Sequence, residues 1–328
     1  MRCELPKKIA ILGAGRSGLA AAKALLDKSI SVFISDTCPP KKLDFILASN
    51  GLAHVPHEAD MHTDKVLHYD ALIVSPGIRF DEDILCRARK AHLPVLPELE
   101  LGWCLSHAPF LAVTGSSGKS TTVCLLGEIF KAAHKEYVVS GNIGIPVSAV
   151  APGKSEECTV IAETSSFQLE AIQRFHPHIA VILNVTKNHL DRHAGFDAYF
   201  SAKTTITRNM TNGDIIVLNG MDDNLCSWIQ ENPKKIHTVY FGKVPVNSDG
   251  IWIDNGTLLY RWNTTSGSII RVDELSIAGL HNQANACAAA AAAKAAGIDD
   301  DAIAQGLARF RGLPHRLEFI AEHNGIAF

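Results

Sequence analysis

Two glycine-rich loops, each lying between an apolar strand and a helix, constrain this chain more than any other feature. The first loop, residues 13–18 (GAGRSG), follows the apolar run 8–12 and precedes an alanine- and leucine-rich segment. The second loop, residues 114–121 (TGSSGKST), follows a strand predicted at 109–114. A strand that enters a helix through such a turn can hold phosphate at the helix N-terminus. Each loop therefore predicts a phosphate-binding unit in an α/β fold.

The predicted elements alternate between strands and helices. Strands are expected at 8–12, 30–35, 71–74, 109–114, 159–162, 179–183 and 215–218, and helices up to about residue 28 and over 122–133. The segment 236–278 is predicted to be β-rich, with turns at 248–250 and 254–256, and the alanine-rich stretch 284–296 to be a buried helix. This alternation indicates a mostly parallel, doubly wound α/β sheet.

Length and composition limit the class of protein. A chain of 328 residues exceeds one ordinary core, and Pro94 and Pro97 mark the first expected domain boundary. The net charge of -3, without a dense run of Lys or Arg, disfavours nucleic acid and anionic membrane as partners. Eight scattered cysteines and no CxxC pair predict reduced thiols in a cytoplasmic protein. We expect no membrane insertion, because the N-terminus has no apolar signal region and the alanine-rich stretch is too short to span a bilayer.

The first glycine loop has the GxGxxG spacing of dinucleotide-binding folds. Asp36 ends the next strand, about where a ribose ligand would be held. Three interpretations stay open at this point: a nicotinamide dinucleotide site, a turn that needs glycine only for packing, and a site for another nucleotide diphosphate. The later motifs favour the third.

The second loop resembles a P-loop but departs from its full spacing, because Val113 stands where the first glycine belongs. Its backbone N–H groups can surround phosphate oxygens, Lys119 can reach the β/γ-phosphates, and Ser120 or Thr121 can offer a hydroxyl to Mg²⁺. The sequence therefore predicts ATP binding. The alternative is a Gly/Ser turn with a solvated lysine.

Polar residues follow two of the later strands. Glu163 comes directly after 159–162, and His189 and Asp191 follow 179–183. Carboxyl ends of strands are where ligands bind in open α/β sheets, and these side chains suit Mg²⁺ beside a nucleotide. The alternatives are a helix cap for Glu163 and a surface or hydrogen-bonded role for His189. From the residues alone, Lys203 would be a solvated helix lysine.

Taken together, the ordered motifs identify a resemblance to the Mur ligases that covers essentially the whole chain. The carriers are the two glycine loops, 75–78 (SPGI), 140–144 (SGNIG), 163–169 (ETSSFQL), 184–186 (NVT), 189–193 (HLDRH), 279–282 (GLHN) with Asn285, and 313–316 (LPHR). The resemblance implies an ATP-dependent amide ligase of cytoplasmic peptidoglycan precursor synthesis. It implies that D-glutamate is added to UDP-N-acetylmuramoyl-L-alanine through an acyl phosphate, by a protein expected to be monomeric.

The resemblance also implies roles for individual residues. Lys119, His189 and Lys203 match catalytic positions. Positions matching ATP contacts are Thr114, Gly115, Ser116, Ser117, Gly118, Lys119, Ser120, Thr121, Asn282, Asn285 and Arg316. Positions matching substrate contacts are Ser17, Asp36, Thr37, Ser75, Pro76, Gly77, Asn142, Ser165 and His189. Two Mg²⁺ sites are implied, with ligands at Ser120, Glu163, His189 and a carbamylated Lys203.

Three domains are implied: a Rossmann-like UDP-substrate domain at 1–97, a central ATP-binding domain at 98–312, and the beginning of a third α/β domain at 313–328. Because the third domain carries the D-glutamate site in the family, we expect this chain to bind the UDP substrate but to turn over poorly. Three residues depart from the family pattern: Ser117 replaces Asn, Thr164 replaces an apolar residue, and Asn188 replaces Asp.

Other functions remain possible from the sequence. One alternative is another Mur ligase or a folylpolyglutamate-type ligase, although the latter lacks a preceding UDP domain. A nicotinamide-dependent oxidoreductase would use the first glycine loop and should bind NAD(P)H instead of UDP. A non-catalytic nucleotide-binding regulator would bind ATP without forming an acyl phosphate.

Overall fold

The computed structural model describes residues 2–142, 144–186, 193, 195–232 and 236–313, with the backbone of 322–323 and 326–327. The chain packs into two compact units. Unit 1 comprises Met1–Phe110, Ser140–Pro177 and Lys187–Asn209, and unit 2 comprises Leu111–Val139, His178–Thr186 and Met210–Phe328. Both units are α/β, which confirms the predicted fold class.

Unit 1 begins with a five-stranded parallel sheet in the order β3-β2-β1-β4-β5. Its elements are β1 (Lys8–Leu12), α1 (Arg16–Leu26), β2 (Ser31–Ser35), α2 (Pro40–Ser49), β3 (His57–Glu58), η1 (Asp64–His68), β4 (Ala71–Val74), α3 (Asp83–Lys90), β5 (Val95–Pro97) and α4 (Glu98–Cys104). The strands predicted at 8–12 and 71–74 are confirmed.

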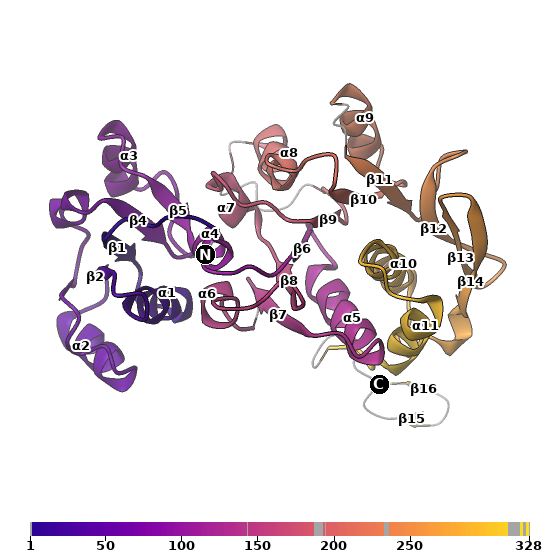
Figure 1. Cartoon of the computed structure of the whole chain (residues 1–328), viewed down its shortest axis with the longest axis horizontal. Coiled ribbons are helices and arrows are strands. Elements are labelled where there is room, and N and C mark those ends of the chain that lie inside the picture. Colours follow the sequence, from indigo (N-terminus) through magenta and orange to yellow (C-terminus); the bar gives the residue numbers. More distant parts are fainter. Residues whose placement is uncertain are drawn as a thin grey trace. The chain divides into compact units, whose positions relative to one another are not determined.

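Strand β1 is apolar and buried from Ile9 to Leu12 because both of its faces are covered. Ile9 and Ile11 belong to one core cluster with side chains of α1 and α2, whereas Ala10 and Leu12 belong to a second cluster with side chains of α3. Figure 1 shows α1 and α2 on one side of this sheet and α3 on the other. Alternating residues of a strand point to opposite faces, so a doubly covered strand loses the polar–apolar alternation.

Later segments complete unit 1, and helix α4 holds two of them through buried carboxylates. The backbone N–H of Ser148 donates to Glu98 at 2.5 Å, and those of Gln173 and Arg174 donate to Glu100 at 2.6 and 2.8 Å. The further elements are α6 (Val147–Val150), β8 (Thr159–Glu163), α7 (Ser166–Glu170), α8 (Phe196–Thr204) and η2 (Thr205–Thr207), together with the end of β7 (Tyr137–Gly141), whose first three residues belong to unit 2.

The second sheet has nine strands in the order β14-β13-β12-β11-β10-β9-β6-β8-β7. From β6 to β12 the pairs within unit 2 are parallel, and β12, β13 and β14 are antiparallel. The elements are β6 (Phe110–Thr114), α5 (Lys119–Ala132), β9 (Ile179–Ile182), β10 (Ile215–Asn219), α9 (Asp223–Glu231), β11 (His237–Phe241), β12 (Asp249–Asp254), β13 (Thr257–Trp262), β14 (Thr265–Arg271), η3 (Val272–Glu274), α10 (Leu280–Ala295), α11 (Asp300–Arg309), β15 (Glu322–His323) and β16 (Ile326–Ala327).

The alanine-rich helix α10 is buried over residues 285–293, as predicted. Small side chains also let helices of unit 2 approach closely: a Cβ at Gly306 of α11 would lie 2.4 Å from the Cα of Ile129 in α5. The three helices α5, α10 and α11 pack together behind the phosphate loop. The start of α5 is therefore fixed by its own helical packing as well as by the strand before it.

One predicted turn is wrong. Residues 249–250 open strand β12, which pairs with β11, and the turn lies earlier, where Ser248 N–H donates to the Pro245 carbonyl at 3.1 Å. The turn predicted at 254–256 is confirmed, with Asn255 and Gly256 at φ +46° and +73° between β12 and β13.

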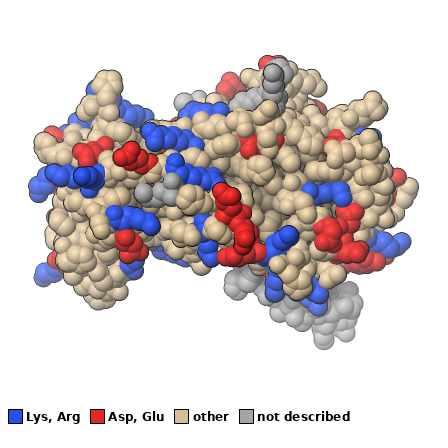
Figure 2. All heavy atoms as spheres, viewed as in Figure 1, with Lys and Arg blue, Asp and Glu red and all other residues tan. Residues whose placement is uncertain are grey.

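The charge distribution on the surface and the state of the cysteines match what the composition predicts. On the face in Figure 2, acidic and basic side chains are interspersed. All eight cysteines are free thiols, as predicted. Within the described part of the chain, no helix has the length and apolar character needed to cross a bilayer.

Candidate functional site

The first candidate site lies in unit 1 at the carboxyl ends of β1 and β4. The strand order reverses there, because β2 follows β1 on one side and β4 lies on the other. Open α/β sheets bind ligands at such a switch point. A cavity of ≈ 410 Å³ occupies the position, lined by Gly13, Gly15, Arg16, Ser17, Ser75, Pro76, Gly77, Ile78, Gly141, Asn142, Gly144 and Pro146. It gathers Ser17, Asn142 and the predicted loop 75–77 around the first glycine loop.

The three glycines of this loop are required for different reasons. Gly13 has φ +93°, a conformation that side chains rarely adopt. A Cβ at Gly18 would lie 1.8 Å from the Gly13 carbonyl oxygen, so this position brings helix α1 close to the strand. Gly15 has φ -76°, and a Cβ there would meet nothing within 4 Å. Neither the backbone conformation nor the packing requires a glycine at position 15. A ligand that approaches the loop backbone closely would require one.

Asp36 holds the glycine loop in place. Its carboxylate accepts hydrogen bonds from Ala14 N–H at 2.6 Å and Cys38 N–H at 2.8 Å. Partial burial raises the pKa of Asp36, but these hydrogen bonds outweigh burial, so the pKa lies below its ordinary value. Its neighbour Thr37 is exposed and does not line the cavity. The structure therefore gives Asp36 a loop-holding role that its predicted substrate role did not include.

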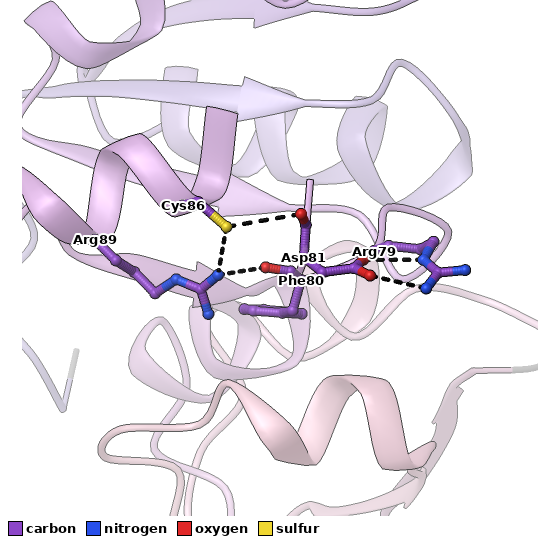
Figure 3. Close-up of polar contacts among 5 residues, drawn as sticks. All are labelled: Arg79, Phe80, Asp81, Cys86 and Arg89. Atoms are coloured by element: carbon purple, nitrogen blue, oxygen red, sulfur yellow. Dashed lines mark hydrogen bonds and ion pairs between the residues drawn. The ribbon is translucent and has the colours of Figure 1, made fainter. Parts of the chain in front are cut away.

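The loop that carries residues 75–77 is fixed by the segment that follows it. Figure 3 shows Arg79 paired with Asp81 through two hydrogen bonds of 2.9 and 2.8 Å. From α3, Arg89 donates to the Phe80 carbonyl at 2.6 Å and to the Cys86 sulfur at 3.3 Å. The helix thereby anchors the far end of this loop.

The second candidate site is the phosphate loop of unit 2. Gly118 has φ +83°, and a Cβ there would lie 2.3 Å from the Asn285 side-chain oxygen. Helix α5 begins directly afterwards at Lys119, three residues earlier than predicted. The Lys119 ammonium donates to the Gly115 carbonyl at 2.8 Å and the Ser116 carbonyl at 3.3 Å. The lysine thus lies over the loop, and the interpretation as a solvated lysine on a Gly/Ser turn is not supported.

The segment after β9 braces this loop. The Asn184 side chain accepts from Ser117 N–H at 3.0 Å and donates to the Ser117 carbonyl at 3.2 Å. Ser116 Oγ accepts from Thr186 N–H at 2.9 Å. Because these bonds hold both serines, Ser117 is fixed by Asn184 although it departs from the family pattern.

A cavity of ≈ 440 Å³ adjoins the loop, which is the size of a small-ligand site. It is lined by Ser117, Gly118, Thr121, Leu183, Asn184, Asn219, Phe241, 276–278, His281, Asn282, Ala284, Asn285 and 311–313. The predicted Asn282 and Asn285 lie here together with the loop. Arg316 lies outside the described residues.

Sequence reasoning missed several members of this cavity. Asn184, Asn219, Phe241, His281 and Arg311 line it but were given no role. Asn184 and Asn219 each follow a buried strand, which is the signal that identified Glu163 and could have identified them.

Glu163 ends strand β8 with a side chain that is 2% exposed. It is not a helix cap, because Ser165 caps α7 in a capping box with Gln168. Its backbone carbonyl accepts from Asn142 N–H at 2.9 Å, which places Asn142 beside Glu163 in unit 1. No hydrogen-bond donor to the Glu163 carboxylate occurs among the described residues, so its oxygens are free for a cation.

Lys203, on helix α8, is 1% exposed, so the interpretation as a solvated helix lysine is wrong. Its ammonium lies 4.7 Å from the centre of the Tyr199 ring. Tyr199 in turn contacts the buried His193, which stacks on Phe167 and lies 3.0 Å from Ser166 Oγ. The position fits a functional lysine. His189 and Asp191 lie outside the described residues.

The donors present suit Mg²⁺ in kind. Ser120 offers a hydroxyl at the start of α5, and Glu163 a buried carboxylate whose oxygens accept no hydrogen bond from the described residues. Oxygen donors are what Mg²⁺ prefers, usually one or two carboxylates together with phosphate and water. Among the described residues, no three His, Cys, Asp or Glu side chains are grouped so that they could hold a metal ion.

These features define the class of protein: an α/β protein with a Rossmann-like glycine loop in unit 1 and a phosphate loop beside a cavity of ≈ 440 Å³ in unit 2. The chain belongs to the Mur ligase family. The Mur ligase middle domain matches residues 113–293, and the MurD-like N-terminal domain of Mur ligases matches residues 7–97.

Curated relatives match nearly the whole chain. The UDP-N-acetylmuramoylalanine--D-glutamate ligase of Pelotomaculum thermopropionicum is 37% identical over 326 residues, which cover 98% of this chain and 70% of the relative. The protein of the same name from Geotalea daltonii is also 37% identical, over 98% of this chain and 71% of its own length.

Solved structures share the fold. The UDP-N-acetylmuramate:L-alanyl-gamma-D-glutamyl-meso-diaminopimelate ligase from Neisseria meningitides has a TM-score of 0.63 at 20% identity, covering 94% of this chain and 99% of that chain. The MurF ligase from Thermotoga maritima in complex with ADP has a TM-score of 0.54 at 17% identity. The match covers 89% of this chain and 66% of that chain.

Proposed function

We propose that this chain is an ATP-dependent amide ligase that adds D-glutamate to UDP-N-acetylmuramoyl-L-alanine in cytoplasmic peptidoglycan precursor synthesis. The proposal rests on one observation above all: one chain, 37% identical to relatives of that name, carries both a phosphate loop and a second nucleotide-type loop. It includes the domain division 1–97, 98–312 and 313–328, which the two family matches at 7–97 and 113–293 support.

In the proposed reaction the L-alanine carboxylate attacks the γ-phosphate of ATP, the bond to ADP breaks, and an acyl phosphate forms. The amine of D-glutamate then attacks the acyl carbon, loses a proton, and inorganic phosphate leaves. Two anions must approach each other in the first step, so catalysis is mainly positioning and charge neutralisation. Lys119 and the N-terminus of α5 supply positive charge to the phosphates, and no protein nucleophile is needed.

The proposed Mg²⁺ ligands are Ser120, Glu163, His189 and a carbamylated Lys203. When bound, Mg²⁺ would neutralise phosphate charge. The residues contribute by position: the Ser120 hydroxyl follows the phosphate loop, and Glu163 presents a carboxylate that the described residues leave free. Burial of Lys203 supports a role other than that of a surface lysine, and a carbamate there would offer oxygen donors to Mg²⁺.

The family matches disfavour the oxidoreductase alternative, because residues 113–293, which carry the phosphate loop, match the Mur ligase middle domain. A folylpolyglutamate-type ligase is disfavoured by the match of residues 7–97 to the N-terminal domain of Mur ligases.

Calorimetry and product analysis test the proposal. We expect the chain to bind UDP-N-acetylmuramoyl-L-alanine more tightly than UDP-N-acetylmuramate, to bind ATP, and to ignore NADH. Any amide product with UDP-N-acetylmuramoyl-L-alanine should require D-glutamate and be detected by mass spectrometry. Binding of NADH without binding of UDP nucleotides would refute the proposal, and a product that requires a different amino acid would move the chain to another member of the family.

A further inference from the structure

Arg16 is the one charged side chain among the described residues that line the glycine-loop cavity of unit 1. It is exposed, and its guanidinium donates a short hydrogen bond to the carbonyl of Gly144, in the loop between β7 and α6. Arg16 also lines a neighbouring cavity of ≈ 590 Å³. The side chain therefore stands at the edge of the proposed nucleotide site and bonds to the loop on its far side.

Arg16 puts a positive charge at the N-terminus of helix α1, which destabilises the helix unless an anion is bound nearby. It is the first helical residue, Gly15 provides no side-chain cap, and the first turn contains no acidic residue. A cation at a helix N-terminus adds to the positive end of the helix dipole and destabilises the helix. A sequence that breaks this local rule at a site suggests that an anion restores the balance.

A diphosphate is an anion of the right kind. The first N–H groups of α1 have no acceptor within the helix, and Gly15 leaves open space beside them. The N–H of Ala14 is already bonded to the Asp36 carboxylate, whose negative charge faces the same loop. A guanidinium beside the loop supplies positive charge there, and its planar group can donate two hydrogen bonds to a phosphate.

Resting on the proposed function, we infer that Arg16 is the residue that selects a nucleotide diphosphate in the unit 1 site. When the substrate binds, the Arg16 guanidinium gives up its hydrogen bond to the Gly144 carbonyl and donates to a phosphate oxygen instead. It thereby distinguishes a diphosphate from a nucleoside, and it links the loop between β7 and α6 to occupancy of the site.

Calorimetry with UDP and with uridine tests this inference on the wild type, Arg16→Gln, Arg16→Lys and a matched control, Lys23→Gln. Lys23 lies on the same helix, is exposed, and lines only the neighbouring cavity. Arg16→Gln should weaken UDP binding about tenfold or more, as expected for loss of a charge-assisted pair, and should change uridine binding by less than about twofold. Arg16→Lys should fall between, and Lys23→Gln should match the wild type.

The outcomes separate this inference from the proposed function. If the wild type binds UDP and Arg16→Gln binds it equally well, the inference on Arg16 is wrong and the proposed function stands. An equal loss of UDP and uridine affinity would mean a structural role and would also overturn it. If the wild type binds no UDP at all, both fail. Thermal unfolding of the ligand-free variants checks that the substitutions leave the fold intact.

Discussion

At the scale of single residues, Lys203 is the position at which the structure differs most from the sequence-based expectation, because a lysine expected to be solvated is buried. A lysine that is 1% exposed must be paired or uncharged, because burying an isolated ammonium is strongly unfavourable. The Tyr199 ring at 4.7 Å supplies a cation–π contact to the ammonium. A carbamate at this position would reverse the charge and offer oxygen donors to Mg²⁺.

We therefore predict that, in an enzyme that includes the family's third domain, Lys203→Ala lowers D-glutamate-dependent ADP formation about a hundredfold or more, as loss of a main electrostatic group does. Acetate or formate should restore part of the activity by filling the gap. In ¹³C-bicarbonate, NMR of the wild type should show a carbamate signal that Lys203→Ala lacks. Lys131→Ala, which changes an exposed lysine of α5, serves as the control. Wild-type turnover of Lys203→Ala would remove Lys203 from the site.

Glu98 gives a prediction about pH. Its complete burial raises the pKa to about 6 from 4.5, despite the hydrogen bond from Ser148 N–H. An acid whose pKa is raised in the folded state favours folding less as pH rises, so the free energy of unfolding should fall between about pH 4.5 and 6 by about 2 kcal/mol. Glu98→Gln should remove this loss, because an amide does not ionise in this pH range.

Urea unfolding at pH 4.5 and 7.5 measures the effect. Glu98→Gln should be more stable than the wild type at pH 7.5 by up to about 2 kcal/mol and close to it at pH 4.5. Glu100→Gln is the contrast, because both Glu100 oxygens accept backbone N–H groups and an amide nitrogen there would lose one bond. That variant should be destabilised by about 1–3 kcal/mol. Identical pH profiles for the wild type and Glu98→Gln would contradict the argument.

At the scale of elements, the turn from β1 to α1 separates folding from binding. A Cβ at Gly18 would lie 1.8 Å from a carbonyl oxygen, whereas one at Gly15 would meet nothing within 4 Å. We predict that Gly18→Ala lowers the melting temperature strongly, and that Gly15→Ala keeps it but weakens UDP binding about tenfold or more. Differential scanning calorimetry and titration with UDP measure both. Normal UDP binding by Gly15→Ala would show that the open space is not used by the ligand.

The elements also show what the sequence could predict. Strands β1 and β4 were predicted to the residue, because a parallel strand covered on both faces is apolar throughout. The start of β12 was missed because Asp249 and Gly250 resemble a turn. Gly250 is instead required by the sheet, since a Cβ there would lie 2.3 Å from the Tyr240 carbonyl oxygen.

The sites divide in the same way. Each glycine loop is one continuous stretch of sequence, so the spacing of its own glycines was enough to predict it. Asn184 and His281 reach the phosphate-loop cavity from distant segments. Both lie in motifs that carry the family resemblance, and Asn184 also follows a buried strand, but neither motif by itself shows which cavity its residues line. The burial of Lys203 depends on the packing of α8 against α7, which no local pattern reports.

At the scale of the whole molecule, the two loops belong to different units of the chain. The glycine loop lies in unit 1 and the phosphate loop in unit 2. Ligands of the two sites should therefore respond to different substitutions, with the UDP substrate depending on residues such as Arg16 and ATP on the loop that ends in Lys119. Each ligand stabilises the folded chain by an amount that rises with the logarithm of its concentration relative to its Kd.

Lys119→Ala tests this division of labour. Without its ammonium the phosphate loop loses the positive charge that faces the β/γ-phosphates, so ATP binding should fall beyond detection while UDP affinity stays within about twofold of wild type. Thermal unfolding with saturating ATP or UDP measures this, since a ligand at about 100 times its Kd adds about 2.7 kcal/mol to the free energy of unfolding. The ATP-dependent rise in melting temperature should vanish in Lys119→Ala and persist in Lys131→Ala, whose exposed lysine lies at the other end of α5. An equal loss of ATP and UDP stabilisation in Lys119→Ala would mean that the two sites do not bind independently.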